Sequence, residues 1–189
     1  MKKFKLFFCL FLILSIFNNL KSAEQIDPIK VDWSFKGLLG KFDRASLQRG
    51  YQVYNEVCAS CHSMQYLSYR NLGEPGGPEF SEEEVKAIAA GFEVTDGPNA
   101  QGDMFTRPGR PSDKFVSPYP NVNAAAAANG GAYPPDMSVL VKARKGGANY
   151  IYSVLVGYED PPPGINLDDG VYYNKYMAGN KIKMPNNLM

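Results

Sequence analysis

Cys58-Ala59-Ser60-Cys61-His62 is the stretch against which the rest of the chain is interpreted. Two thiols three positions apart, followed at once by an imidazole, form the pattern for covalent attachment of a c-type haem. The thiols add across the haem vinyl groups, and the neutral imidazole of His62 is then held beneath the ring, where it can ligate the iron. We therefore predict one covalent haem c, bound through Cys58, Cys61 and His62.

Three other interpretations of this motif remain open at the level of sequence. A structural zinc site needs about four Cys or His ligands, whereas the whole chain has three Cys and one His, and Cys9 lies in a segment that we expect to be removed. A thioredoxin-like dithiol would follow a strand in a βαβ unit, and no alternating β and α pattern surrounds the motif. The third alternative is a chance meeting of two cysteines with the single histidine.

The N-terminus has the pattern of an export signal. Three lysines open the chain, and the 12-residue apolar run Leu6–Phe17 follows. A helix of that length reaches about 18 Å, well short of the roughly 30 Å hydrocarbon core, so cleavage after Ala23 or nearby is favoured over a permanent span. A start rich in Lys and free of Arg argues against a mitochondrial transit peptide. We predict a signal peptide over 1–23 and a mature chain over 24–189 in the bacterial periplasm.

The mature chain is acidic. The formal net charge of all 189 residues is +1, and removal of 1–23 takes away four lysines and no acid, which leaves −3. Two haem propionates would add further negative charge. Such a field does not suit nucleic acid, and it would speed encounter with a basic partner protein. With 44% hydrophobic and 21% charged residues, the composition is that of one globular domain.

Helical patterns predominate after the signal peptide, with long ordered loops between them. The expected elements are an extended arm over 27–40, helices over 43–57, 81–90, 124–128, 136–145 and 149–156, a shaped loop over 91–121 and a short strand over 171–173. Gly50 lies in the middle of the first helix, where it costs about 1 kcal/mol relative to Ala. That cost predicts another helix crossing closely at Gly50.

The second axial position of the iron has several candidates. Because there is no second His, the usual remaining ligand is a methionine thioether. Apart from the initiator, the candidates are Met64, Met104, Met137, Met177, Met184 and Met189. Met64 is only two residues from His62 and is tethered to the wrong face of the ring, and Met137 follows the apolar pattern of an expected helix.

Met184 is the candidate that spacing favours. Pro185 follows it and biases its backbone towards an extended conformation, which suits a ligand presented from a loop. Spacing does not exclude Met104 or Met177, which also lie in expected loops.

The motifs together resemble a known family. They cover nearly the whole mature chain in order, at 49–54, 58–64, 96–99, 104–109, 118–121, 128–138, 142–144, 147–153 and 172–174. This series is similar to cytochrome c1, the haem subunit of the cytochrome bc1 complex. The resemblance implies a mainly α, class I cytochrome c-like fold with long ordered loops around one covalent c-type haem.

The resemblance also implies further site residues. In the family a methionine of an Ile-x-Met-x-x-x-hydrophobic stretch is the distal ligand, which corresponds to Met184 within 182–188 and makes His62 and Met184 the metal ligands. The family's Arg-Pro-Gly segment implies that Arg107 lies near a haem propionate, a suitable partner for a guanidinium; a solvated loop residue is the alternative. Pro134 and Pro135 resemble the wall at the haem edge, although a turn leading into a helix explains them as well.

The implied function is electron transfer. A cytochrome c1 accepts one electron from the Rieske iron-sulfur protein, beside cytochrome b, and passes it to cytochrome c at the periplasmic face of the bacterial inner membrane. The subunit itself makes and breaks no substrate bonds, although it is part of a quinol–cytochrome c oxidoreductase. The alternatives are a free-standing periplasmic c-type electron shuttle and, from the enzyme class, a thiol oxidoreductase or peroxidase.

The C-terminus departs from the family pattern. In the family a C-terminal helix crosses the first helix at the positions of Gly50 and Tyr54, and a membrane-spanning helix follows. The sequence ends at Met189 and has neither, so we expect either a truncated chain or a variant anchored only by its partners. Loss of the crossing helix predicts an exposed apolar patch around Gly50, Tyr51 and Tyr54.

Overall fold

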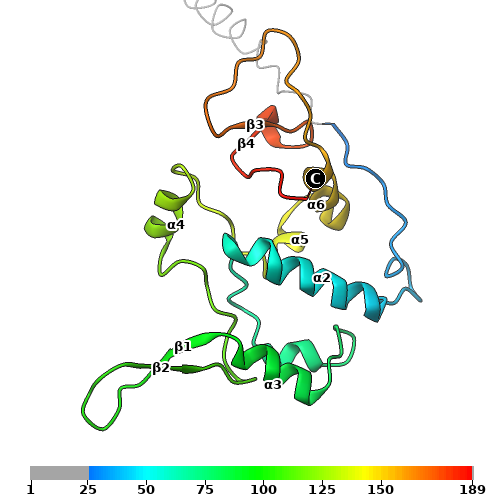
Figure 1. Ribbon diagram of the computed structural model, residues 1–189. Helices are drawn as coiled ribbons and strands as arrows, with labels where there is room; N and C mark the ends of the chain where they lie inside the picture. The colour runs from blue at the N-terminus through cyan, green and yellow to red at the C-terminus, as the bar shows by residue number, and fades with distance from the viewer. Residues whose placement is uncertain (1–25, 189) are drawn as a thin grey trace, which may run out of the picture.

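The computed structural model describes residues 26–188, so the predicted signal peptide lies outside the described part. Helices predominate, as predicted (Figure 1). The elements are α2 (Arg44–Glu56), η2 (Cys58–Ser60), η3 (Tyr69–Gly73), α3 (Glu82–Ala90), β1 (Glu93–Asp96), β2 (Phe105–Pro108), α4 (Val122–Ala128), α5 (Leu140–Ala143), α6 (Gly147–Val156), β3 (Tyr172–Tyr173), η4 (Ala178–Asn180) and β4 (Lys181–Ile182). Within 26–188, no helix combines the length and apolar character needed to cross a bilayer.

Helix α2 delivers the haem motif. Asp43 is extended and its carboxylate accepts a hydrogen bond from the Ser46 amide at 2.7 Å, which fixes the start of the helix. The predicted helix over 43–57 is confirmed. Its inner face turns Tyr54 into the core, where only 8% of the residue is exposed. The Cys58–His62 motif therefore directly follows a helix that is fixed by its N-cap and by the burial of Tyr54.

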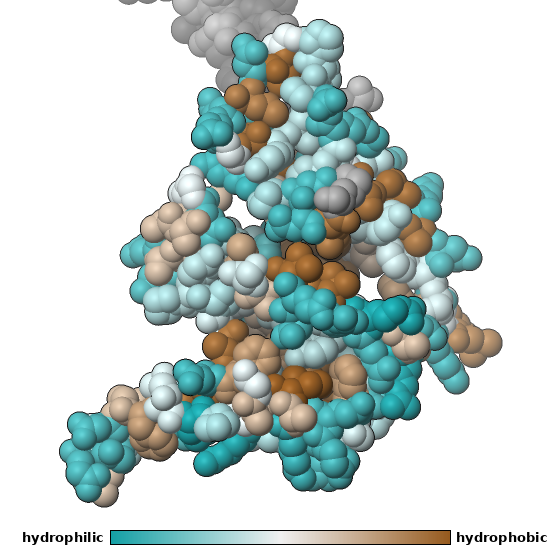
Figure 2. All heavy atoms as spheres, viewed as in Figure 1, coloured by the Kyte–Doolittle hydropathy of each residue, from teal (hydrophilic) through white to brown (hydrophobic). Residues whose placement is uncertain are grey.

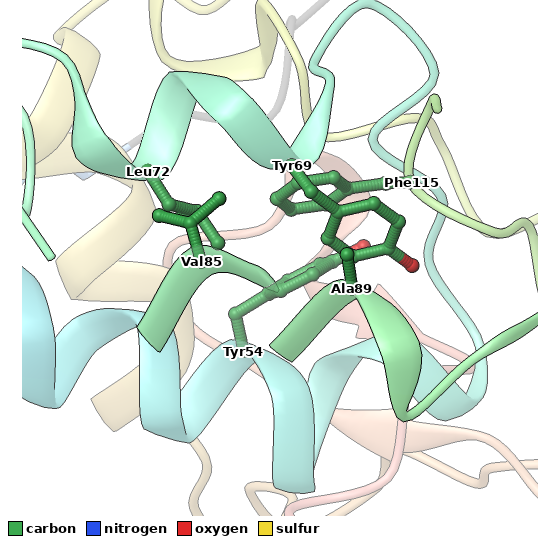
Figure 3. Packing of buried hydrophobic residues seen from close by; sticks show 6 residues of the cluster. All are labelled: Tyr54, Tyr69, Leu72, Val85, Ala89 and Phe115. Atoms are coloured by element: carbon green, nitrogen blue, oxygen red, sulfur yellow. The ribbon is translucent and has the colours of Figure 1, made fainter. Parts of the chain in front are cut away.

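The main apolar cluster lies between α2 and α3 (Figure 3). Its buried members are Tyr54, Tyr69, Leu72, Val85, Ala89 and Phe115. The Tyr69 ring stacks on Phe115 with centroids 4.8 Å apart. Helix α3 begins at the predicted capping box of Ser81 and Glu84, and its buried residues Val85 and Ala89 join the cluster. This cluster fixes the part of the molecule that carries Cys58, which packs against it.

A β-hairpin occupies part of the long segment that the sequence predicts as a loop. Strands β1 and β2 pair antiparallel, with Val94 opposite Arg107 and Asp96 opposite Phe105. The loop prediction over 91–121 is wrong for these strands. Apolar and polar residues alternate little along these strands, so the period-two sequence signal of a strand is weak. Ion pairs of Arg107 with Asp96 and Asp113 support the hairpin.

Two helix boundaries also differ from the prediction. Helix α4 is capped by Asn121, whose side chain accepts from the Ala124 amide at 2.9 Å, rather than by Asn123. The helix expected over 136–145 is reduced to α5, Leu140–Ala143. Asp136 does not extend it because its carboxylate is bonded to the distant Ser63 and Gln65. Its carboxylate thus joins two segments that are distant in the sequence, in addition to accepting from the Ser138 amide at 2.9 Å.

The remaining elements form a second packing unit on the other side of α2 in Figure 1. The predicted extended arm runs along α6, where the Ile29 amide donates to Ser153 Oγ at 2.7 Å and the Trp33 indole donates to Asn149 Oδ1 at 2.7 Å. Helix α6 confirms the helix expected over 149–156, and β3 confirms the short strand. Strand β3 pairs with β4, so the segment that leads to Met184 lies beside this unit.

The outer face of α2 matches its predicted environment only in part: the space at Gly50 is open as predicted, and Tyr54 is not exposed. An added Cβ at Gly50 would meet no atom within 4 Å, so no described helix crosses there. Tyr54 is buried, and Tyr51 packs edge-on against Phe80 with centroids 5.7 Å apart. The predicted exposed patch is therefore wrong for Tyr54, because Phe115 covers it from the inner side.

Candidate haem site

Cys58, Cys61 and His62 occupy one tight turn at the end of α2. The amides of Cys61 and His62 both donate to the Cys58 carbonyl, at 3.1 and 2.8 Å. Both thiols are free and half-buried. The turn therefore keeps the two thiols and the imidazole in one short, internally bonded segment, as attachment of a single ligand requires.

The thiols do not have the chemistry of a redox dithiol. Burial, and to a smaller degree the nearby Cys61, raise the pKa of Cys58. Reactive thiols in Cys-x-x-Cys oxidoreductases have a lowered pKa and lie at helix N-termini. Cys58 follows the C-terminal end of α2, where the helix dipole disfavours a thiolate. These observations argue against the thiol oxidoreductase alternative.

The imidazole of His62 is oriented by a residue 73 positions away. Its Nδ1 lies 2.8 Å from the carbonyl oxygen of Pro135. A carbonyl can only accept, so Nδ1 carries the proton and Nε2 keeps the lone pair needed for a metal ion. A metal-bound histidine usually donates its other ring N–H to such a carbonyl or to a carboxylate. Pro135, which the sequence associates only with the haem edge, thus fixes the tautomer and direction of His62.

Asp136 fastens the segment after His62 to the segment after Pro135. Its carboxylate accepts from Ser63 Oγ at 2.8 Å and from the Gln65 amide at 2.9 Å. Burial acts to raise the pKa of Asp136, but these bonds and those from Ser138 outweigh it and lower the pKa. The sequence gives no sign of this contact, because 71 or more positions separate Asp136 from its partners Ser63 and Gln65. The result is a rigid support for the imidazole.

The candidate methionines lie in different surroundings, and Met189 lies outside the described residues 26–188. Met64 and Met137 pack against the apolar cluster, and Met104, which directly precedes β2, is 60% exposed. The thioether of Met177 accepts a hydrogen bond from the Tyr150 hydroxyl at 3.6 Å. Met184 is half-buried, and its backbone carbonyl accepts from the Tyr158 hydroxyl at 2.9 Å.

A buried polar atom lies close to Met184 in the sequence. Asn186 Oδ1 is buried and has no hydrogen-bond partner among residues 26–188. Such an atom is costly when it stays unpaired, so it marks a position where a bound group or water supplies the missing contact. The segment that carries Met184 thus has the character of a ligand-facing segment.

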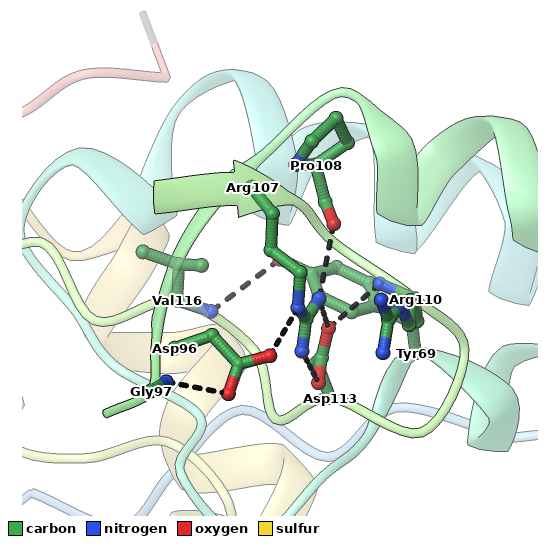
Figure 4. A network of polar contacts seen from close by, with 8 residues as sticks. All are labelled: Tyr69, Asp96, Gly97, Arg107, Pro108, Arg110, Asp113 and Val116. Atoms are coloured by element: carbon green, nitrogen blue, oxygen red, sulfur yellow. Dashed lines mark hydrogen bonds and ion pairs between the residues drawn. The ribbon is translucent and has the colours of Figure 1, made fainter. Parts of the chain in front are cut away.

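Arg107 is held by two carboxylates (Figure 4). Its Nε donates to Asp96 at 2.5 Å, and its two terminal nitrogens donate to Asp113 at 2.7 and 3.0 Å. The hydrogen bonds from Arg107 lower the pKa of Asp113 to about 2, and they also lower the pKa of Asp96. With 15% of its side chain exposed, Arg107 is not the solvated loop residue of the alternative interpretation. Its contact with a propionate stays a prediction.

The site residues fit a covalent haem. Figure 2 shows the surface hollowed between α2 and the part that carries β3 and β4, with hydrophobic atoms in the hollow. Two free thiols and an imidazole with an available Nε2 lie in one turn, as covalent attachment of a c-type haem needs. The half-buried Met184 follows β4, in a separate segment. Within the described range, no group of three or more His, Cys, Asp or Glu side chains could hold a metal ion by itself.

Comparison with known proteins identifies the family of the chain. A family model described as "Cytochrome C1 family" matches residues 33–189. The chain belongs to the cytochrome c1 family. The resemblance seen in the sequence is therefore confirmed, and the match covers all the site residues discussed above.

Relatives in the cytochrome c1 family include plant, fungal and bacterial proteins. The chain is 50% identical over 176 residues to "Cytochrome c1 1, heme protein, mitochondrial" of Arabidopsis thaliana, covering 91% of this chain and 56% of the relative. It is 48% identical over 176 residues to cytochrome c1 of Rhodospirillum rubrum, and the match covers 85% of this chain and 64% of that relative. It is 50% identical over 197 residues to "Cytochrome b/c1" of Bradyrhizobium diazoefficiens, and the match covers 94% of this chain and 29% of that relative. The chain thus spans less than two thirds of the length of each of these curated relatives.

Proposed function

We propose that this chain is the haem-carrying part of a cytochrome c1, with one haem c attached through Cys58 and Cys61. The observation that carries the proposal is the contact of His62 Nδ1 with the Pro135 carbonyl, directly beside the two free thiols. It leaves Nε2 as the donor for iron, which is what a proximal haem histidine requires. The proposed fold is that of a class I cytochrome c, within a haem domain over 24–189 that follows a signal peptide over 1–23.

Met184 is the proposed distal ligand. Met64 and Met137 are packed in the apolar cluster, Met104 is largely exposed, and the Met177 sulfur is engaged by a hydroxyl. For Met184 only the backbone carbonyl is engaged, which leaves the thioether for coordination. Family membership supports the same assignment, because the stretch 182–188 has the family's ligand pattern.

The site is suited to electron transfer and not to bond chemistry. The bound haem supplies a one-electron ferric–ferrous couple. His62 and Met184 would fill both axial positions, so no open coordination position remains for dioxygen or a substrate. The Pro135 contact orients the imidazole and the Asp136 contacts hold the segment beside it, which would limit movement of His62 during electron transfer. A thioether opposite the imidazole favours ferrous iron and raises the potential.

The proposed partners follow from the family and the charge. We infer that the chain accepts an electron from a Rieske iron-sulfur protein beside cytochrome b and passes it to a cytochrome c, at the periplasmic face of the bacterial inner membrane. Relatives named cytochrome c1 and cytochrome b/c1 support this assignment. The net charge of −3 expected after removal of 1–23 suits a basic acceptor.

Two measurements test the proposal. Expressed with a c-type maturation system, the denatured chain should gain the mass of one haem and give an alkaline pyridine haemochrome spectrum of the c type. Cys58→Ser together with Cys61→Ser should abolish both signals. Purification from native membranes should recover cytochrome b with the chain, whereas a free-standing electron shuttle would be recovered alone.

A further inference from the structure

Helix α6 ends in a corner that leaves little freedom to the chain. At Gly157, the residue after α6, an added Cβ would lie 2.5 Å from the ring of Tyr176 and 2.6 Å from the Ser153 carbonyl, so no side chain fits. The Asn174 side chain, 0% exposed, donates to the Val154 carbonyl at 2.7 Å and accepts from the Tyr176 amide at 3.1 Å. The backbone that leaves α6 is therefore fixed by packing and by buried hydrogen bonds.

Tyr158 extends from this corner towards the distal ligand. It forms an isolated antiparallel bridge with Asn174, and its ring packs edge-on against Tyr172 with centroids 6.4 Å apart. Its hydroxyl donates to the Met184 carbonyl at 2.9 Å, with the Pro185 carbonyl at 3.4 Å. Burial raises the pKa of Tyr158 to about 12, so the hydroxyl keeps its proton at neutral pH.

The Met184 segment has few other attachments. Upstream, the last strand pair joins Tyr172 to Ile182. Lys183 donates to the Gly130 carbonyl at 2.6 Å, but this contact is exposed and rests on a flexible side chain. The Tyr158 contact thus acts on Met184 itself, and Tyr158 directly follows the closely packed Gly157 at the end of α6.

We propose that Tyr158 is a positioning residue that holds the Met184 backbone so that its thioether stays on the haem iron. This inference rests on the proposed function, in which Met184 is the distal ligand. A methionine side chain has three rotatable bonds, so the cost of ordering it for coordination is high unless its backbone is already fixed. Tyr158 reduces that cost without touching the iron.

The experiment measures competition for the distal position. Imidazole coordinates iron and competes with a thioether. In the haem-loaded full chain, Tyr158→Phe should raise the affinity of the ferric protein for imidazole about three- to tenfold, the ratio expected for loss of one hydrogen bond. Tyr152→Phe is the matched control, because Tyr152 lies on α6, is 39% exposed and packs on Trp33. Its imidazole affinity should equal that of the wild type.

The outcomes separate the inference from the proposed function. Unchanged imidazole affinity in Tyr158→Phe, or an equal increase in Tyr152→Phe, would overturn the positioning role. A lower thermal midpoint with unchanged affinity would do the same, because it would show a merely structural contact. If Met184→Ala binds imidazole no more tightly than the wild type, the distal ligand assignment fails instead.

The wild-type protein provides a second test if Tyr158→Phe does not fold. The contact predicts a slowly exchanging Tyr158 hydroxyl proton with nuclear Overhauser effects to Met184 and Pro185 in the ferrous protein. A hydroxyl proton in fast exchange with water would overturn the inference.

Discussion

The two parts of the molecule that would hold the iron are built differently. The His62 side rests on an aromatic cluster of Tyr54, Tyr69 and Phe115. The Met184 side has few buried apolar residues, Val154 and Tyr176 among them, and depends on the buried amide of Asn174 and the hydroxyl of Tyr158. Apolar packing tolerates small changes at moderate cost, whereas a buried polar contact fails as a unit when one partner is removed. The distal side therefore depends on individual polar contacts, and the proximal side on shared apolar packing.

The largest effect on stability is expected on the proximal side. Phe115→Ala removes a 6% exposed ring that contacts Tyr54 and Tyr69, so the free energy of unfolding should fall by about 3–5 kcal/mol. Denaturant unfolding of the haem-loaded chain measures it. Tyr66→Ala, at a position 69% exposed, is the control and should change stability by less than about 0.5 kcal/mol. Equal losses in both variants would contradict the assignment of the core.

A somewhat smaller loss is expected on the distal side. Asn174→Ala leaves the Val154 carbonyl and the Tyr176 amide without their side-chain partners, at a cost of about 2–4 kcal/mol. Hydrogen exchange should show faster exchange at 172–183 while the α2 and α3 amides stay protected. Uniform loss of protection in both parts would show that the two sides unfold together and that the contrast is false.

The ion pair between Arg107 and Asp113 should make the stability of the chain depend on pH. Arg107 lowers the pKa of Asp113 to about 2 from an ordinary value of 3.8. A lowered folded-state pKa contributes stability that is present above pH 3.8 and is lost as pH falls towards 2. Asp113→Asn should therefore cost about 1 kcal/mol at pH 7 and flatten the stability curve between these pH values. Thermal midpoints measured across this range test it; an unchanged slope would contradict the ion pair. Asp103→Asn, in the exposed turn of the hairpin, is the control.

The smallest effect should have the opposite sign. Gly50 lies in the middle of α2 with open space where a Cβ would be, so Gly50→Ala should stabilise the 189-residue chain by about 0.5–1 kcal/mol. A helix packed closely on Gly50 would instead make the same change destabilising. A thermal midpoint of Gly50→Ala below that of the wild type would thus indicate that a helix does pack on Gly50.

Features that depend on neighbouring residues could be predicted from the sequence, and features that depend on distant contacts could not. The Asp43 cap and the Ser81 capping box are local patterns, and each is found where the sequence places it. The roles of Pro135 and Tyr158 depend on contacts across 73 and 26 positions. No local period reports such contacts, and the helix predicted over 136–145 begins too early because the carboxylate of Asp136 is bonded to the distant Ser63 and Gln65.

The central claim is that one iron ion joins these two differently built sides through His62 and Met184, and the sulfur-to-iron absorption of the ferric protein tests it most directly. Met184→Ala should abolish the weak far-red band and lower the reduction potential, with the covalent haem still present by mass. Met177→Ala should keep the band, since the sulfur of Met177 is engaged by Tyr150. An intact band in Met184→Ala together with its loss in Met177→Ala would contradict the account and move the distal ligand to Met177.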